Sequence, residues 1–297
     1  MPLFPDTGLW ADVFPRDRLW RHYFWHVVRS TIPFVVIAVF ALILDWMTHF
    51  PIEIGVTTYE VGGGALGVFL VLRTNSGYER WWDARKLWGG ITNQSRSLAT
   101  AAIAYGANDQ WKAEIIGWIA LFGHAARRRL RGDLELPEAD HLIGTDATAT
   151  LMTSTHRPVA IALKIADLLN EAAGQLPPPI LMQMERDRIT LIDNIGGCER
   201  ILSTPVPQAY TILIRQFLVM FLASFPFGIL QKVTWLTPLI TLFVAFPMLA
   251  LDEIGTELQN PFSTDNVNHL PLDKYCQNIE ETLMELLADK SPIVHDE

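Results

Sequence analysis

The stretch Val233–Leu251 reads VTWLTPLITLFVAFPMLAL and contains no charged side chain over its 19 residues. Folded as a helix, it would extend about 28 Å, which is close to the ~30 Å hydrocarbon core of a bilayer. An uncharged run of this length predicts a helix that spans a membrane, and we place one expected span at residues 233–251.

Three further apolar stretches lie at 27–49, 55–72 and 205–230. The stretch 55–72 is interrupted by Glu60, and the stretch 205–230 contains Arg215. An ionised group in lipid costs several kcal/mol, so we expect these two helices to face protein or water. The alternative is that both are core helices of a soluble part of the chain.

The composition agrees with a membrane protein. The 297 residues are 50% hydrophobic and 19% charged, and the mean hydropathy is +0.21. The net charge of −9 argues against general nucleic-acid binding, which needs a basic surface. Two isolated cysteines, Cys198 and Cys276, match no metal or redox spacing, and we expect both to be buried as small side chains.

The positions of Lys and Arg predict the orientation. Residues 1–29 hold four, residues 45–60 none, residues 73–204 fifteen, and the short 231–232 segment only Lys232. Because cytoplasmic loops carry the excess of Lys and Arg, this alternation predicts four spans with both termini in the cytoplasm of a bacterial-type inner membrane.

The rest of the chain is expected to be a helical cytosolic region, 73–204 with 252–297, in a single domain that covers residues 1–297. Breaks between its helices are predicted near Gly106, at Gly132–Pro137 and at Pro177–Pro179. The apolar spacing from Asp273 to Leu287 predicts a final amphipathic helix that packs on its own protein.

A four-residue ladder on the second expected span is the most informative pattern. Glu60, Gly64, Val68 and Leu72 lie roughly along one helix face, acidic at one end and small or apolar beyond it. Several copies around an axis would form a narrow apolar neck capped by carboxylates, which is a recurrent selectivity device. The alternative is an ordinary packed helix with Glu60 at its interface.

The glycines of the same stretch have a second interpretation. Residues 62–67, GGGALG, match G-x-G-x-x-G, but the strand before it and the acidic residue about 20 positions later are not evident. We therefore expect Gly63 and Gly67 to permit close approach between membrane helices instead.

Several motifs in order resemble the bestrophin family, in its prokaryotic branch, over about residues 15–290. They are RTNSGYERWWDARKLWG at 73–89, GGCER at 196–200, TPVPQAYT at 204–211, NPF at 260–262 and LPLD at 270–273. The resemblance implies an all-α integral membrane protein that forms a homopentamer around an axial pore. Each subunit would have four transmembrane helices that continue into a large cytosolic helical region.

The resemblance also implies ion conduction, of chloride in the animal members and of small cations in a bacterial one. The family's neck maps onto Gly64, Val68 and Leu72, although glycine replaces a bulky residue at the outermost position. A second aperture, at an apolar residue just before a long helix, maps onto Pro179 with Ile180 beside it. The calcium clasp of animal members corresponds here to 263–269, whose one carboxylate predicts no tight calcium gating.

Ion selectivity is open to two interpretations. Asp45, Glu53 and Glu60 lie in the expected outer segments against Lys232, so an acidic outer mouth predicts a preference for cations such as Na⁺ or K⁺. The alternative is a chloride channel in which backbone dipoles of the proline-broken segment 204–210 coordinate the anion.

The remaining charged groups receive structural interpretations. Arg215 is expected to pair with a carboxylate or reach a water-filled vestibule. The cluster Arg127, Arg128, Arg129 and Arg131 is expected to be a solvated or lipid-facing patch, and His22 with His26 to lie on a membrane-surface helix.

No enzyme motif is evident, so we expect no enzyme, cofactor or metal site. The partners expected are permeant monovalent ions, the lipid bilayer and further copies of the chain. A secondary transporter is a weaker alternative, because no repeated halves are evident.

Overall fold

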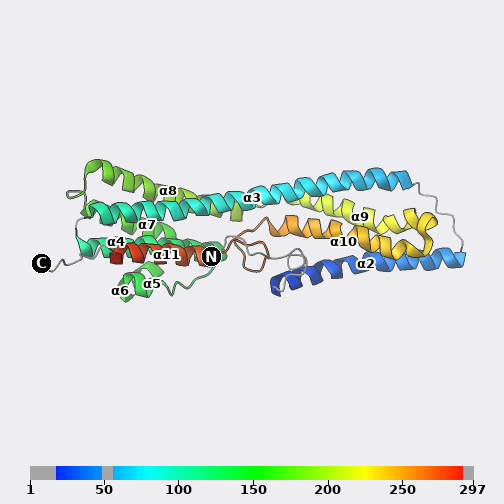
Figure 1. Ribbon diagram of the computed structural model, residues 1–297, viewed down its shortest axis with the longest axis horizontal. Helices are drawn as coiled ribbons and strands as arrows, with labels where there is room; N and C mark the ends of the chain where they lie inside the picture. Colours follow the sequence, from blue (N-terminus) through cyan, green and yellow to red (C-terminus); the bar gives the residue numbers. More distant parts are fainter. Residues whose placement is uncertain (1–17, 49–55, 107, 290–297) are drawn as a thin grey trace. The chain divides into compact units, whose positions relative to one another are not determined.

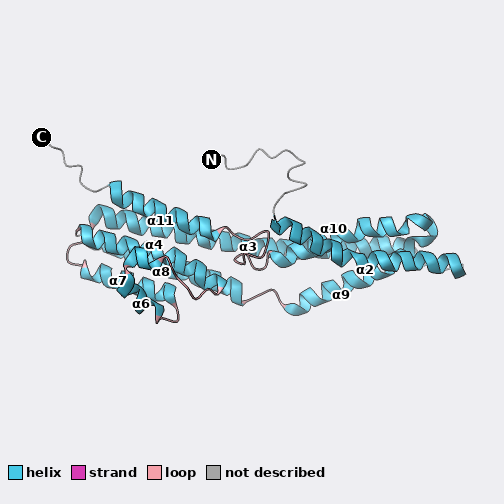
Figure 2. Cartoon of the chain, turned by 90° about the horizontal axis from the view of Figure 1, so that it is seen from below, coloured by secondary structure: helices cyan, strands magenta, loops and turns pink. Residues whose placement is uncertain are grey.

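The computed structural model describes residues 18–48, 56–106 and 108–289, and every regular element in these ranges is a helix (Figures 1 and 2). The all-α class predicted from the sequence is confirmed for the described residues. The helices are α2 (Arg18–Thr48), α3 (Val56–Tyr105), α4 (Asp109–Arg131), α5 (Ala139–Ile143), α6 (Thr145–Met152), α7 (Arg157–Glu171), α8 (Pro178–Ser203), α9 (Gln208–Val233), the 3-10 turn η1 (Thr234–Leu236), α10 (Thr237–Glu257) and α11 (Leu272–Asp289).

The chain divides into two compact units, each made of segments that are distant in sequence. The first combines residues up to Trp81 with Pro205–His269, and the second combines Trp82–Thr204 with the residues from Leu270 onward. Helix α3 contributes its beginning to the first unit and its end to the second.

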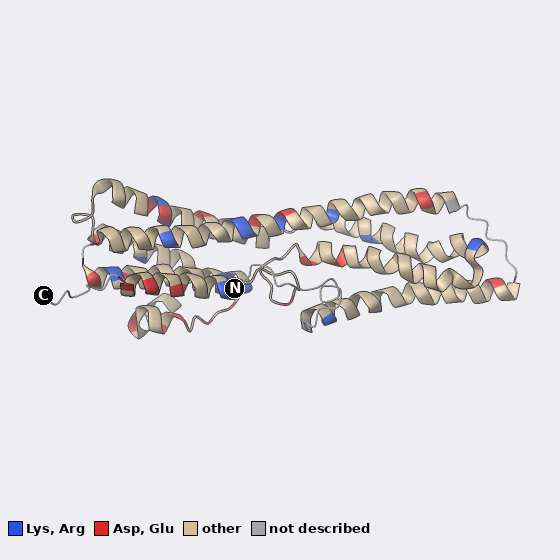
Figure 3. Ribbon diagram, viewed as in Figure 1, with Lys and Arg blue, Asp and Glu red and all other residues tan. Residues whose placement is uncertain are grey.

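The first unit contains α2, the beginning of α3, α9 and α10, and each expected membrane span falls on one of them. Helix α2 packs along α10, and both contact α9. Figure 3 shows few charged residues on α2, α9 and α10. Side chains from all four helices form the buried apolar core of this unit: Phe34, Tyr59, Leu66, Leu70, Ile214, Leu218, Phe221, Leu222 and Ala245.

The break between α9 and α10 lies at a different position from the one expected between the third and fourth spans. It lies at η1 (Thr234–Leu236), three residues later than the expected boundary at 231–232. Thr234 carries the turn with φ 45°, an unusual conformation for a β-branched residue, and Pro238 then sits in the first turn of α10. Gln231 and Lys232, the polar residues at the expected boundary, lie in the last turn of α9 instead.

By length and hydropathy alone, two described helical segments are apolar enough to cross a membrane, Leu19–Thr48 and Gln208–Glu257. The second segment contains both α9 and α10. The beginning of α3 is not among them, because its glycines and Glu60 dilute the apolar side chains.

The second unit is organised around α4, which packs against α7 and α11, while α7 also packs on α8. The predicted breaks are confirmed: α3 ends at Tyr105, α4 ends before Gly132, whose φ of 76° suits glycine, and α8 begins at Pro178. The predicted final helix is confirmed as α11, which buries Cys276, Ile279 and Leu283.

The two cysteines are free and buried, as expected. Burial raises the pKa of the Cys198 thiol and of the Cys276 thiol to about 12.

The arginine cluster at the end of α4 does not form the solvated patch that we expected. Arg127 is buried and binds two carboxylates, with its Nη2 2.6 Å from Glu138 Oε1 and its Nη1 2.8 Å from Asp273 Oδ1. Arg131 also binds Asp273, with Nη1 2.8 Å from Oδ2. The counter-charges come from other segments of the chain, so the basic run is neutralised within the protein and fastens α11 to α4.

The carboxylates of this cluster have lowered pKa values. Burial raises the pKa of Glu138, but hydrogen bonds from Arg128 and Arg127 outweigh this effect and lower it to about 2. Burial also opposes ionisation of Asp273, yet the hydrogen bond and charge of Arg131 bring its pKa below the usual value. Both groups therefore stabilise the folded unit as carboxylates.

The contact between α3 and α9 generates a stability prediction. Gly228 lies so close to the Tyr59 ring that an added Cβ would overlap it, whereas Gly196 on α8 has open space. We expect Gly228→Ala to destabilise the detergent-solubilised protein by roughly 1–3 kcal/mol, because the aromatic ring must move. Thermal unfolding would measure the shift, and Gly196→Ala is the matched control that should leave the melting temperature unchanged or raise it slightly. Equal effects of the two substitutions would contradict the packing argument.

The pairing of Glu138 with Arg127 and Arg128 of α4 predicts a dependence of stability on pH. Glu138 has a folded pKa of about 2 against an ordinary value of 4.5, so its contribution is complete above about pH 4.5 and is lost as the pH falls toward 2. We expect Glu138→Gln to lower the melting temperature at pH 6 and the difference from the wild type to shrink steadily between pH 4.5 and pH 2. Glu285→Gln, at an exposed carboxylate of α11, is the control and should leave the melting temperature at pH 6 close to that of the wild type. A difference for Glu138→Gln that stays constant with pH would refute the assignment.

Candidate functional site

The predicted ladder on α3 lies on a face that its own chain leaves open. Val68 is 59% exposed and Leu72 49% exposed, and Glu60 and Gly64 are also exposed. An added Cβ at Gly64 would meet no atom within 4 Å. By contrast, Leu66 and Leu70 on the opposite face are 0% and 1% exposed. One face of the helix therefore packs in the core of the unit, and its opposite, apolar face is not covered by the described residues of this chain.

The buried face is fixed by aromatic contacts with α9. The Tyr59 hydroxyl donates a hydrogen bond of 2.9 Å to the Ser224 carbonyl oxygen, and the Tyr59 ring meets Phe221 edge-on at 6.0 Å between centroids. Further along α3, Phe69 meets Phe217 in the same way at 6.4 Å. These contacts fix the rotation of α3 and so determine which of its side chains remain exposed.

The glycine prediction is correct for one of its two residues. An added Cβ at Gly63 would lie 3.1 Å from the Phe221 ring, so this glycine permits close packing of α3 on α9. Nothing lies within 4 Å of a Cβ at Gly67. Gly67 lies on the side of the helix that no described residue of this chain covers.

Two of the three residues expected at the outer mouth lie within the described residues. Glu60 is exposed, and Asp45 is half-buried near the end of α2. Within the described residues, no hydrogen bond or ion pair joins these two carboxylates. Glu53 lies outside the described residues.

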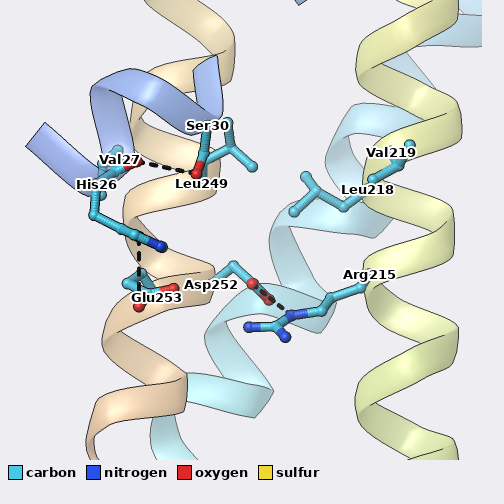
Figure 4. A pocket seen from close by; sticks show the side chains of 9 residues that line it. All are labelled: His26, Val27, Ser30, Arg215, Leu218, Val219, Leu249, Asp252 and Glu253. Atoms are coloured by element: carbon cyan, nitrogen blue, oxygen red, sulfur yellow. Dashed lines mark hydrogen bonds and ion pairs between the residues drawn. The ribbon is translucent and has the colours of Figure 1, made fainter. Parts of the chain in front are cut away.

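About four turns beyond Tyr59 along α3, two arginines share one buried carboxylate. Arg73 of α3 pairs with Oδ1 of Asp252 on α10, and Arg215 Nε of α9 lies 2.9 Å from Oδ2 of the same carboxylate (Figure 4). Both guanidinium groups also donate to Thr256 Oγ1, each at 2.9 Å. The expectation that Arg215 pairs with a carboxylate is confirmed, and the contact joins α3, α9 and α10.

This cluster is unevenly buried. The side chain of Arg73 is 2% exposed and that of Asp252 is 9% exposed, whereas the side chain of Arg215 is 45% exposed. Because two cations share one anion, the cluster carries a net positive charge that only Arg215 presents to its surroundings. Sequence reasoning missed the roles of Arg73 and Asp252, although each directly follows an apolar run and so lies at the end of an expected span, where a charge costs less than in its middle.

The segment after α10, which contains the Asn-Pro-Phe motif, is held by side chains of the same unit. Phe262 is fully buried, and the Trp81 indole donates 2.7 Å to the Asn268 carbonyl oxygen. The Asn266 amide donates to the carbonyl oxygens of Glu257 and Asn260, at 3.1 and 3.0 Å. Side-chain amides thus act as hydrogen-bond partners of the backbone here and fix the turn.

The residues proposed for the second aperture lie elsewhere in their helix than expected. Pro179 and Ile180 were placed just before a long helix, but α8 begins at Pro178, so both occupy its first turn. Proline is tolerated there because the first amides of a helix have no partner within the helix. Pro179 is exposed and Ile180 is half-buried.

Known proteins of one family match most of this chain in sequence. The sequence model of the family described as Bacterial/Fungal Bestrophin protein matches residues 22–285, which include parts of both units. A voltage-dependent anion channel-forming protein of Synechocystis is 34% identical over 75% of this chain and 74% of its own length. A protein of the same description from Escherichia coli K12 is 31% identical over 82% of this chain and 80% of its own length.

The fold also has solved counterparts. A crystal structure of a bacterial bestrophin homologue from Klebsiella pneumoniae superimposes with a TM-score of 0.82 and 25% sequence identity, over 88% of this chain and 98% of that one. The resemblance predicted from the motifs at 73–89, 196–200 and 260–262 is thereby confirmed. The chain belongs to the bacterial and fungal bestrophin family.

Proposed function

We propose that this chain is the subunit of a homopentameric ion channel in a bacterial-type inner membrane. In this proposal α2, the beginning of α3, α9 and α10 span the membrane, and both termini are cytoplasmic. The exposed ladder on α3 carries the argument, because an apolar helix face that the chain leaves uncovered is suited to line an axis between copies. Val68 and Leu72 would form the apolar neck, with Gly64 as its wider outer step.

We further propose that the channel passes anions such as chloride. The curated relatives that resemble this chain are named as anion channel-forming proteins, which favours the anion alternative over the cation preference drawn from the acidic mouth. In the chain itself, α9 begins at Gln208 after Pro205 and Pro207, and no side chain caps its first amides. Free amides at a helix start attract anions.

A cation channel is kept as a second candidate because of one observation. Glu60 is exposed at the start of the ladder, and within the described residues no Lys, Arg or His side chain forms an ion pair with it. Copies of Glu60 around an axis would concentrate cations. The channel proposal also includes a cytosolic aperture at Pro179 and Ile180. It includes an outer mouth to which Asp45 and Glu53 contribute.

The reversal potential decides between the two ions. We expect purified protein in a planar bilayer, under a sodium chloride gradient, to reverse near the chloride equilibrium potential. Glu60→Gln should then increase anion conductance at low salt, where screening of the carboxylate is weakest. A wild-type potential near that of sodium, reduced in Glu60→Gln and unchanged in Glu285→Gln, would instead establish the cation channel. Absence of any current from reconstituted pentamer would overturn the channel proposal.

The position of the neck is tested by shortening its central side chain. Val68→Ala removes two carbons from each copy, and at about 0.8 kcal/mol per carbon we expect the conductance or open probability to rise about fifteenfold. Single-channel recording measures the change. Val39→Ala on α2, which also shortens an exposed valine, is the control and should leave the current unaltered. Wild-type currents in Val68→Ala would place the gate elsewhere.

A further inference from the structure

A pocket of about 260 Å³ opens between α2, α9 and α10 within the first unit (Figure 4). Its walls come from three residues on each helix: His26, Val27 and Ser30, then Arg215, Leu218 and Val219, and finally Leu249, Asp252 and Glu253. It lies away from the exposed ladder of α3, to which the channel proposal assigns the ion path.

The pocket is polar at one end and apolar at the other. Figure 4 shows the side chains of Arg215, Asp252 and Glu253 gathered at one end, with Leu218 and Val219 toward the other. The sequence explains this division, because Leu218 and Val219 follow Arg215 by one helical turn toward the middle of the expected span. An occupant must therefore have a charged part near the membrane surface and an apolar part that enters the bilayer.

The polar end offers one cation with unused donors. Arg215 uses its Nε for Asp252 and one N–H of Nη2 for Thr256. A guanidinium has five N–H donors, so three are left for a ligand or for water, counted over the described residues. Asp252 cannot serve a ligand in the same way, since both its oxygens are bound to arginines.

The polar end also offers one carboxylate with spare capacity. Within the described chain, the side chain of Glu253 makes one close contact with a basic side chain, His26, whose Nδ1 lies 3.7 Å from Oε1. That distance exceeds a hydrogen bond, so the acceptors of Glu253 are available. Arg73 and Glu257 also interact with Glu253 electrostatically. Asp252 is shared with the buried Arg73, which does not line the pocket, so the pocket presents the charges of Arg215 and Glu253 to an occupant. This pair suits an occupant that carries one charge of each sign.

We propose that this pocket binds the headgroup of a zwitterionic phospholipid that bears a primary ammonium, such as an ethanolamine lipid. The phosphodiester binds the free donors of Arg215, the ammonium binds Glu253, and an acyl chain lies along Leu218 and Val219. This assignment relies on the helices spanning a membrane, as proposed above, but it does not depend on conduction or on the permeant ion.

Other headgroups fit less well. A lipid with a glycerol headgroup carries only the phosphate charge, which Arg215 attracts and Glu253 repels. A choline headgroup has the right charges but no N–H to donate to Glu253. Inorganic phosphate has neither the ammonium nor the chains that Leu218 and Val219 would contact.

Native mass spectrometry of the detergent-solubilised assembly tests the proposal. Lipids with identical acyl chains and ethanolamine, glycerol or choline headgroups are added in turn, and the lipid retained per chain is counted. We expect the wild type to retain the ethanolamine lipid roughly two- to fivefold more than either of the others, the range expected for one partly exposed ion pair. Inorganic phosphate in excess should not displace it.

Two substitutions separate the contributions of charge and shape. Glu253→Gln should abolish the preference for ethanolamine over choline while leaving total retention similar. Val219→Trp, which fills the apolar end without touching a charge, should lower retention of all three lipids. Glu79→Gln, at an exposed carboxylate of the same unit that does not line the pocket, is the matched control.

Several results would overturn the assignment. Equal retention of the three headgroups by the wild type, an unchanged preference in Glu253→Gln, or displacement of the lipid by phosphate would each show that the pocket is not a headgroup site. Retention can be measured on assemblies that conduct no current, so failure of the channel proposal and failure of this one give different results.

Discussion

The carboxylate of Asp252 is the contact on which the first unit depends, because it binds Arg73 of α3 and Arg215 of α9 while it belongs to α10. A buried ion with a missing partner costs about 3–5 kcal/mol, so none of the three groups can be removed singly without penalty. Thr256 adds a neutral acceptor for both guanidiniums and donates its own hydroxyl to the Asp252 carbonyl oxygen. Charge and hydrogen bonding thus fix three helices at one level.

The open face of α3 is a consequence of how this helix is held at both ends of its first stretch. Tyr59 attaches it to α9 near its start, and Arg73 attaches it to α10 about four turns later. Both attachments use the side of the helix that also carries Leu66 and Leu70. Val68 and Leu72 are therefore excluded from the core by the geometry of the attachments, although they are as apolar as the residues inside it.

The spacing of apolar residues and prolines along the sequence predicted helices and breaks that depend only on neighbouring residues. Cys276, Ile279 and Leu283 revealed α11, and the prolines at 177–179 revealed the start of α8. The pairing of Arg73 with Asp252 joins residues 179 positions apart and leaves no periodic signal. The arginines of α4 were expected to be solvated or lipid-facing for the same reason. The carboxylates that bind them come from other segments of the chain, which the local sequence does not reveal. The break between α9 and α10 was expected at Gln231 and Lys232, but these residues lie in the last turn of α9, because a polar pair at the end of an apolar run does not distinguish a turn from the end of a helix.

The same stretch of α3 carries opposite charges at its two ends, and this limits what a single charged residue reveals about selectivity. Glu60 and Arg73 are 13 residues apart, or about 20 Å along the helix, which exceeds the ~8 Å screening length at physiological salt. The charge of Glu60 therefore acts near its own end of the stretch, while Arg73 is buried and paired with Asp252 at the other end. In the proposed channel, an acidic outer end would raise the local cation concentration, but the ion that crosses would be the one whose loss of hydration free energy within the neck is smallest. For that reason the acidic residues alone predicted a cation preference, whereas the similarity of most of the chain to proteins named as anion channel-forming favours anions.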